Sequence, residues 1–81
     1  DIDMTAVKMV KNKDQGLAFT ERFVGDATVV LTDSQATGND AGSQEINIRA
    51  EQLDAGTGDL TLDNTVASKI SRIGVTVTRL P

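Results

Sequence analysis

Three aspartates form the densest group of acids in the chain. They are Asp54, Asp59 and Asp63, spaced around Gly56 and Gly58. Carboxylate and carbonyl oxygens in a flexible loop are the ligands that calcium prefers. The spacing lacks the acids at alternate positions that open the EF-hand calcium loop, and Asp and Gly are also ordinary turn formers. The segment therefore indicates a turn, with these aspartates as weak calcium candidates and no firm metal site.

No residue pattern in the chain is typical of catalysis. The sequence has no His and no Cys, which removes imidazole and thiol chemistry together with the preferred zinc ligands. Ser68 and Lys69 are adjacent, so on a strand their side chains point to opposite faces. Gly56-Thr57-Gly58 precedes a strand-like segment, whereas a phosphate-binding loop precedes a helix. We therefore expect no enzyme, no catalytic residues and no cofactor.

The charge and aromatic content argue against nucleic-acid binding. The net charge is −4, from 8 Lys and Arg against 12 Asp and Glu. Base-stacking residues are limited to Phe19 and Phe23, which are better placed in a core. Lys8, Lys11 and Lys13 form a small basic cluster, which indicates a solvated turn or, alternatively, a contact with an acidic partner.

The first ten residues are the best candidate for a contact with another protein. Ile2, Met4 and Ala6 alternate with other residues, and the apolar phase then shifts to Val7 and Met9. A terminal strand of this kind can add to the open sheet edge of a neighbour, where main-chain hydrogen bonds supply affinity. The alternative is that the segment pairs within its own sheet. We predict these five residues to be an assembly strand.

The rest of the chain reads as short strands separated by turns. Alternating apolar residues predict strands, and Gly, Asp and Asn clusters separate them at intervals near ten residues. This pattern favours an all-β, mostly antiparallel fold, a small sandwich or barrel of six to seven strands in one domain over 1–81. The predicted strands are 17–24, 26–32, 43–52, 59–63 and 74–80.

Several segments leave alternatives open. Asn64 or Thr65 is a possible cap for one short helix near 65–73 that ends at Gly74. Residues 5–13 also show partial helical spacing. The polar stretch 34–43 predicts a mobile loop, and no internal repeat is evident.

The expected core is small for a domain that must be stable alone. A chain of 81 residues without Cys lacks disulfides, so association with other subunits is the support we expect. The residues predicted to build the core are Phe19, Phe23, Val29, Leu31, Ile46, Ile48, Leu60, Leu62, Ile70, Ile73, Val75 and Val77.

These observations together predict a structural role. We expect a non-enzymatic subunit or domain of an extracellular or cell-surface assembly, such as a bacterial pilus-like filament, that contacts protein subunits, either copies of itself or a companion chain. A virion capsid or decoration protein is the alternative, and a calcium-stabilised binding module is a third hypothesis. No apolar run is long enough to cross a bilayer, although a removed leader or anchor would leave no trace in this sequence.

Overall fold

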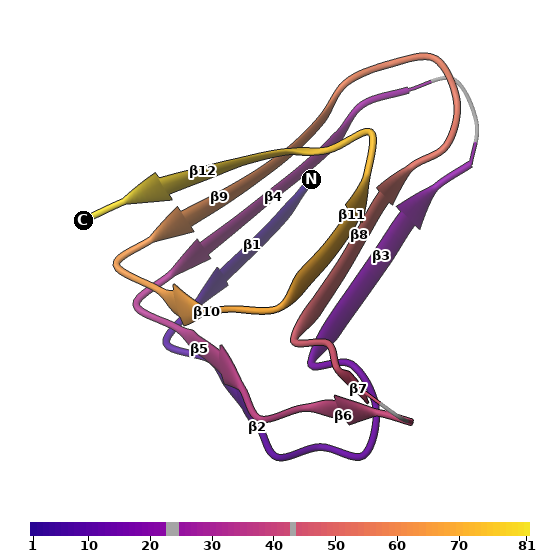
Figure 1. The fold of residues 1–81 in the computed structure, drawn as a ribbon. Coiled ribbons are helices and arrows are strands. Elements are labelled where there is room, and N and C mark those ends of the chain that lie inside the picture. The colour runs from indigo at the N-terminus through magenta and orange to yellow at the C-terminus, as the bar shows by residue number, and fades with distance from the viewer. Residues whose placement is uncertain (23–24, 43) are drawn as a thin grey trace.

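All regular structure in the described part of the chain is β-structure. The computed structural model describes residues 1–22, 25–42 and 44–81, and within these ranges it contains no helix, and so none able to span a membrane. The strands, shown in Figure 1, are β1 (Ile2–Thr5), β2 (Lys8–Val10), β3 (Leu17–Glu21), β4 (Ala27–Thr32), β5 (Gln35–Thr37), β6 (Asp40–Ala41), β7 (Gln44–Glu45), β8 (Ile48–Gln52), β9 (Gly58–Asp63), β10 (Val66–Ala67), β11 (Ile70–Ile73) and β12 (Thr76–Leu80).

The strands stack into three parallel sheets. The first sheet has the order β1-β4-β9-β12, the second β2-β5-β10 and the third β3-β8-β11. Successive turns of the chain, here called coils, each contribute one strand to each sheet: β1 to β3 form the first coil, β4 to β8 the second and β9 to β11 the third, while β12 begins a fourth. A chain wound in this way is a parallel β-helix, in which each coil contacts only its neighbours.

The predicted antiparallel sandwich or barrel is therefore wrong. Among the described strands only β6 and β7 pair in antiparallel fashion. The turn signals near every tenth residue favour a sandwich or barrel, but most of them mark corners between the sheets of one coil. Three strands and three corners complete a coil before the chain returns to the first sheet, so neighbours in sequence seldom pair.

The coils are a structural repeat whose length varies along the chain, from 31 residues between Leu17 and Ile48 to 17 residues between Leu60 and Val77. Ile2 pairs with Val29 and Val29 with Leu60, which gives intervals of 27 and 31 residues. The same longer interval joins Leu17 to Ile48 in the third sheet. The four extra residues enter the second coil between its second and third sheets, where the β6–β7 hairpin projects from the corner. Few identities link the coils, so the repeat appears mainly as a recurrence of apolar positions.

The core lies between the sheets and consists of columns of stacked side chains. Parallel pairing in register places paired residues on the same face, so apolar residues one coil apart lie above one another. One column runs through Met4, Leu31 and Leu62, and the last two are 0% and 1% exposed. The buried cluster comprises Met9, Val29, Leu31, Ala36, Ile48, Ala50, Leu60, Leu62, Ala67 and Val75.

The corners between the first and second sheets recur with the same backbone shape. Ala6, Asp33 and Asn64 each have a positive φ, of 58°, 51° and 47°. The Asn64 side-chain amide donates to Asp33 Oδ1 at 2.7 Å, so two of the three corners are bonded along the helix axis. Asp and Asn tolerate this left-handed conformation better than Ala, because their side chains bond locally.

A buried asparagine pair joins the coils at another corner. Asn39 and Asn47 are both 0% exposed, and Asn39 Nδ2 donates to Asn47 Oδ1 at 3.0 Å and to the Met9 carbonyl at 2.8 Å. Asn47 Nδ2 donates to the carbonyl of Ser68 in the next coil at 2.7 Å. The polar stretch 34–43 was predicted to be a mobile loop, but its described residues contain β5, β6 and this buried Asn39.

The short helix predicted near 65–73 is also wrong. Its residues form β10 and β11, separated by a corner at which Lys69 has a φ of 53°. The spacing of Val66, Ile70 and Ile73 resembles a helical face, but pairing with the second coil overrides this local preference. Gly74 lies in the turn to β12 rather than at a helix end, and its φ of 66° is of the kind that glycine adopts without strain.

Most of the predicted core is found at least partly buried. Phe19, Ile70 and Val77 are half-buried and pack against the central cluster. Ile73 is an error, because it pairs with Glu51 on the outer face and is 54% exposed. Phe23 lies outside the described residues. The remaining predicted members, all buried, are Val29, Leu31, Ile46, Ile48, Leu60, Leu62 and Val75.

Candidate functional site

The two ends of the β-helix are the parts of the structure best suited to contact another protein. At the first-coil end, β1, β2 and β3 are edge strands; at the last-coil end, β10, β11 and β12 are edge strands. An edge strand has a row of backbone N–H and C=O groups available for pairing. Within each of the three sheets all strands are parallel, so either edge of a sheet can accept a further parallel strand.

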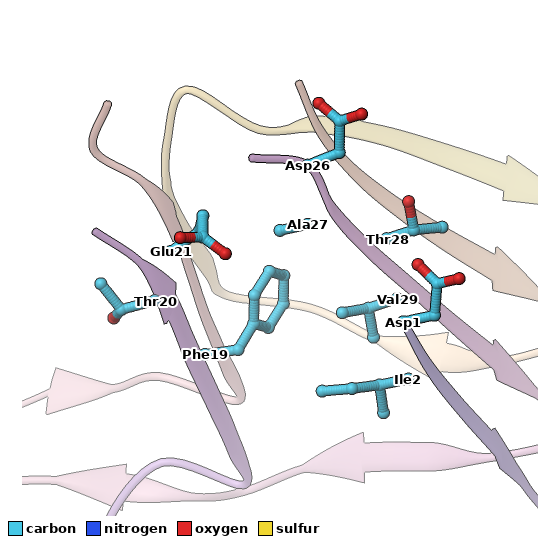
Figure 2. A pocket seen from close by; sticks show the side chains of 9 residues that line it. All are labelled: Asp1, Ile2, Phe19, Thr20, Glu21, Asp26, Ala27, Thr28 and Val29. Atoms are coloured by element: carbon cyan, nitrogen blue, oxygen red, sulfur yellow. The ribbon is translucent and has the colours of Figure 1, made fainter. Parts of the chain in front are cut away.

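The first-coil end contains a pocket that is apolar inside and acidic at its rim. The pocket has a volume of about 160 Å³, and the Phe19 side chain extends from β3 across it toward Ile2 and Val29 (Figure 2). Ile2 is 36% exposed although it points toward the core, because β1 is an edge strand of its sheet. The residues that line this acidic pocket are Asp1, Ile2, Phe19, Thr20, Glu21, Asp26, Ala27, Thr28 and Val29.

One carboxylate of the acidic pocket is held by the backbone of the next coil. The Thr57 backbone N–H donates to Asp26 Oδ1 at 2.9 Å. This hydrogen bond, with a contribution from the Thr57 side chain, lowers the pKa of Asp26 below its ordinary value because it stabilises the charged form. The basic cluster is placed elsewhere on the first coil, with Lys8 on β2 and Lys11 at the corner after it.

The last-coil end differs because two arginines occupy core-facing positions. Arg72 pairs with Ala50 and Arg79 with Leu62, and both partners point into the core. With Ile70 and Val77, the two arginines line an open hollow of about 520 Å³, here called the arginine hollow. Guanidinium groups thus share this end of the core with aliphatic side chains.

Both arginines are anchored to backbone carbonyl groups. Arg72 Nη1 donates to the carbonyl of Val75 at 3.1 Å, and Arg79 Nη2 donates to the carbonyl of Ala67 at 2.8 Å. Arg79 thus reaches across the end of the core from the first sheet to the second. Each guanidinium has five N–H donors, so these bonds leave donors available for carboxylates.

Sequence reasoning did not single out the two arginines. Their signal was present in the alternation, because Arg72 follows Ile70 and Arg79 follows Val77 at the two-residue spacing of one strand face. An arginine that continues an apolar face occupies a core-facing position on its strand. Recognising this required the repeat, which assigns a coil to each strand.

The predicted assembly strand is divided between two strands of the first coil. Ile2 and Met4 lie on β1 and Met9 on β2, with all three side chains directed toward the core. The phase shift in the sequence marks the corner, where Ala6 adopts a positive φ and Val7 begins the next side. The side chains therefore pack within the chain, and what β1 and β2 present outward is a backbone edge. Addition of a neighbour's strand there remains a prediction.

The three candidate calcium ligands are not gathered into one group. Asp54 Oδ1 accepts a hydrogen bond from the Ala55 backbone N–H at 2.8 Å, as in an ordinary turn. Asp59 and Asp63 lie on the same face of β9, four residues apart, which separates them by about 13 Å along an extended strand. Within residues 1–22, 25–42 and 44–81, no cluster of three or more metal-ligating side chains is present.

Comparisons with known proteins add no relationship to this description. No protein-family model matches the chain, and neither a curated protein nor a solved structure matches it.

Proposed function

We propose that this chain is a non-enzymatic structural module of an extracellular or cell-surface assembly, such as a pilus-like filament. It associates with protein subunits through the strand edges at the ends of its β-helix. The observation that carries the proposal is that, in the described structure, each end of the β-helix presents one edge strand from each of three parallel sheets.

The physical reason is the shape of a short solenoid. The molecule is only 15 Å thick along its shortest axis, in keeping with three to four strand layers spaced about 4.8 Å apart. In such a stack only the middle layers have neighbours on both sides, so a large share of the core side chains belongs to an end. Adding a layer at either end pairs backbone groups and removes apolar side chains such as Ile2 from water.

The composition supports a structural role in a further way. The chain has no disulfide and a small core, and domains of this kind usually gain stability from a partner. Strand addition provides that stability through backbone hydrogen bonds, which need no reactive side chain.

Static light scattering over a concentration series, with electron microscopy of the concentrated sample, tests the proposal. We expect the wild-type chain to form oligomers whose mass rises with concentration. Ile2→Lys places an inward-pointing charge at the edge of the first coil and should weaken this association. Thr61→Lys adds the same charge to the outer face of the central strand β9, and it should associate like wild type. A persistent monomer that brings no companion chain from its native source would contradict the proposal.

A further inference from the structure

We propose that the corner between the second and third sheets is a self-modification site, at which Lys69 and Asn47 form an amide bond between their side chains and release ammonia. Such a bond is an isopeptide bond, and here it joins the second coil to the third. The reaction occurs once in each chain and goes beyond the proposed function, because it takes place whether or not the chain associates. Its basis is the set of hydrogen bonds around the Asn47 side chain.

The side-chain carbonyl oxygen of Asn47 is held by two N–H donors. The Asn39 backbone N–H and Asn39 Nδ2 each donate to Asn47 Oδ1 at 3.0 Å. Nucleophilic attack on an amide carbon moves negative charge onto this oxygen, and donors fixed in a buried site stabilise that charge. Both asparagines are 0% exposed, so water is kept away as a competing nucleophile. Asn47 therefore has an amide activated for attack by a neighbouring side chain.

A carboxylate contacts the nitrogen that leaves in this reaction. Asn47 Nδ2 donates to Glu45 Oε2 at 2.8 Å and to the Ser68 carbonyl at 2.7 Å. The hydrogen bond from Asn47, followed by the one from the Gly38 backbone N–H, lowers the pKa of Glu45 below its ordinary value, and the nearby charge of Lys69 adds to this. Glu45 is therefore ionised at neutral pH, which is the state that a general base requires.

Lys69 occupies the equivalent corner position of the next coil. Ile48 pairs with Ile70, so Asn47 lies opposite Lys69, and the Asn47 backbone N–H donates to the Lys69 carbonyl at 3.1 Å. Neighbouring strands are about 4.8 Å apart, a separation that the four-carbon stem of lysine can span. Lys69 is exposed, and its side chain lines the same surface pocket as Glu45. The lysine amine and the asparagine amide thus have Glu45 as a common neighbour.

The bonds and protons of the reaction balance without an oxidant or a reductant. The neutral Lys69 amine attacks Asn47 Cγ, and the Nζ–Cγ bond forms while Glu45 takes a proton from the attacking nitrogen. The Asn39 donors stabilise the oxyanion that results. Glu45 then gives the proton to Nδ2, the Cγ–Nδ2 bond breaks and ammonia leaves. One amide replaces another, and Glu45 returns to its ionised form.

Mass spectrometry of the folded chain tests the proposal. We expect the wild-type mass, on isolation or after incubation at neutral and mildly alkaline pH, to be lower by one ammonia than the sequence requires. A tryptic digest should contain a branched peptide that joins Asn47 to Lys69. Lys69→Arg keeps the positive charge but removes the amine, so this variant should keep its full mass. Lys8→Arg, the same change at another exposed lysine, should react like wild type.

A second variant tests the role of the carboxylate. Glu45→Gln keeps an oxygen that can accept the hydrogen bond from Asn47, but a neutral amide cannot take up the proton. Circular dichroism checks that the variant folds, and we expect the cross-link to form at least about 100-fold more slowly than in wild type. Glu51→Gln makes the same change in β8 and should react at the wild-type rate.

Three results would overturn the inference. The first is a wild-type chain that keeps its full mass at both pH values. The second is a loss of ammonia that persists in Lys69→Arg, because an asparagine that cyclises onto its own backbone also releases ammonia and needs no lysine. The third is an unchanged rate in Glu45→Gln, which would remove the carboxylate from the reaction. None of these measurements depends on association, so each leaves the proposed function to its own test.

Discussion

The two ends of the β-helix finish the same core in different ways. One column of paired residues runs from Met4 through Leu31 and Leu62 to Arg79, so it begins with an aliphatic side chain and ends with a guanidinium. A second column runs from Phe19 through Ala50 to Arg72. Both columns therefore begin with an apolar side chain in the first coil and end with an arginine in the last coil or in β12.

The largest expected effect is on the free energy of unfolding, which should fall more when a side chain is truncated in the middle of a column than at its end. Leu31→Ala should destabilise the chain by about 3–5 kcal/mol, because the side chain is fully buried and leaves a cavity between two coils. Met4→Ala, in the same column but only half-buried at the end, should cost about 1–2 kcal/mol. Urea denaturation followed by circular dichroism measures both. Equal losses would show that the ends are as well packed as the middle.

A smaller difference should separate the two ends of the second column. Phe19→Ala removes a half-buried ring from the acidic pocket and should cost about 2 kcal/mol. Arg72→Ala removes an exposed side chain with a single hydrogen bond to Val75 among the described contacts, and should cost less than about 1 kcal/mol. The same denaturation experiment compares them. If Arg72→Ala were the more damaging change, the arginines would be holding the last coil together rather than covering it.

The equivalent corner residues Ala6, Asp33 and Asn64 allow a substitution in the first coil that should stabilise the fold. Ala6→Asn should raise stability by about 1 kcal/mol, because Asn tolerates the positive φ better than Ala and extends the bonded pair formed by Asp33 and Asn64. The matched change Asn64→Ala should lower stability by a similar amount. Thermal melting of the two variants decides the sign. A loss of stability in Ala6→Asn would mean that the first corner does not follow the pattern of the others.

The smallest expected effect concerns acid at the first-coil end. The hydrogen bond from Thr57 lowers the folded-state pKa of Asp26, so the stabilisation it provides is present above the unfolded pKa, about 3.9. It is lost as the pH falls through the folded-state value. Asp26→Asn should therefore reduce the loss of stability below about pH 4. Melting temperatures measured from neutral to acidic pH compare this variant with wild type.

Individual strands were largely predictable, but their partners were not. Leu60 and Leu62 were correctly predicted to face inward on 59–63, because alternation within one strand reports which face is buried. The same alternation carries no information about pairing direction, and turn signals are alike for a hairpin and for a corner of a coil. The strands that were missed, such as β5 and β10, are too short for alternation to reveal.

The candidate site residues were likewise predictable only in part. The phase shift between Ala6 and Val7 was visible in the sequence. Only the structure shows that it marks a corner between two sheets, and that the corner directs the side chains of Ile2 and Met9 into the same core. Asp54 and Asp63 were grouped because they are near in sequence, yet a strand carries them apart. Arg72 and Arg79 were not identified from the sequence, because neither belongs to a recognisable motif. They line the same hollow only because the fold brings β11 and β12 together.

Neighbouring residues in the sequence are enough to indicate that this chain is built of strands, where many of them run and which of their side chains avoid water, because these properties follow from local chemistry. Only the folded chain shows that the strands wind into a parallel β-helix, with Phe19 and Met4 in its first coil and arginines at the other end of the same columns. That outcome depends on hydrogen bonds between residues about a coil apart, whose partners no local pattern specifies.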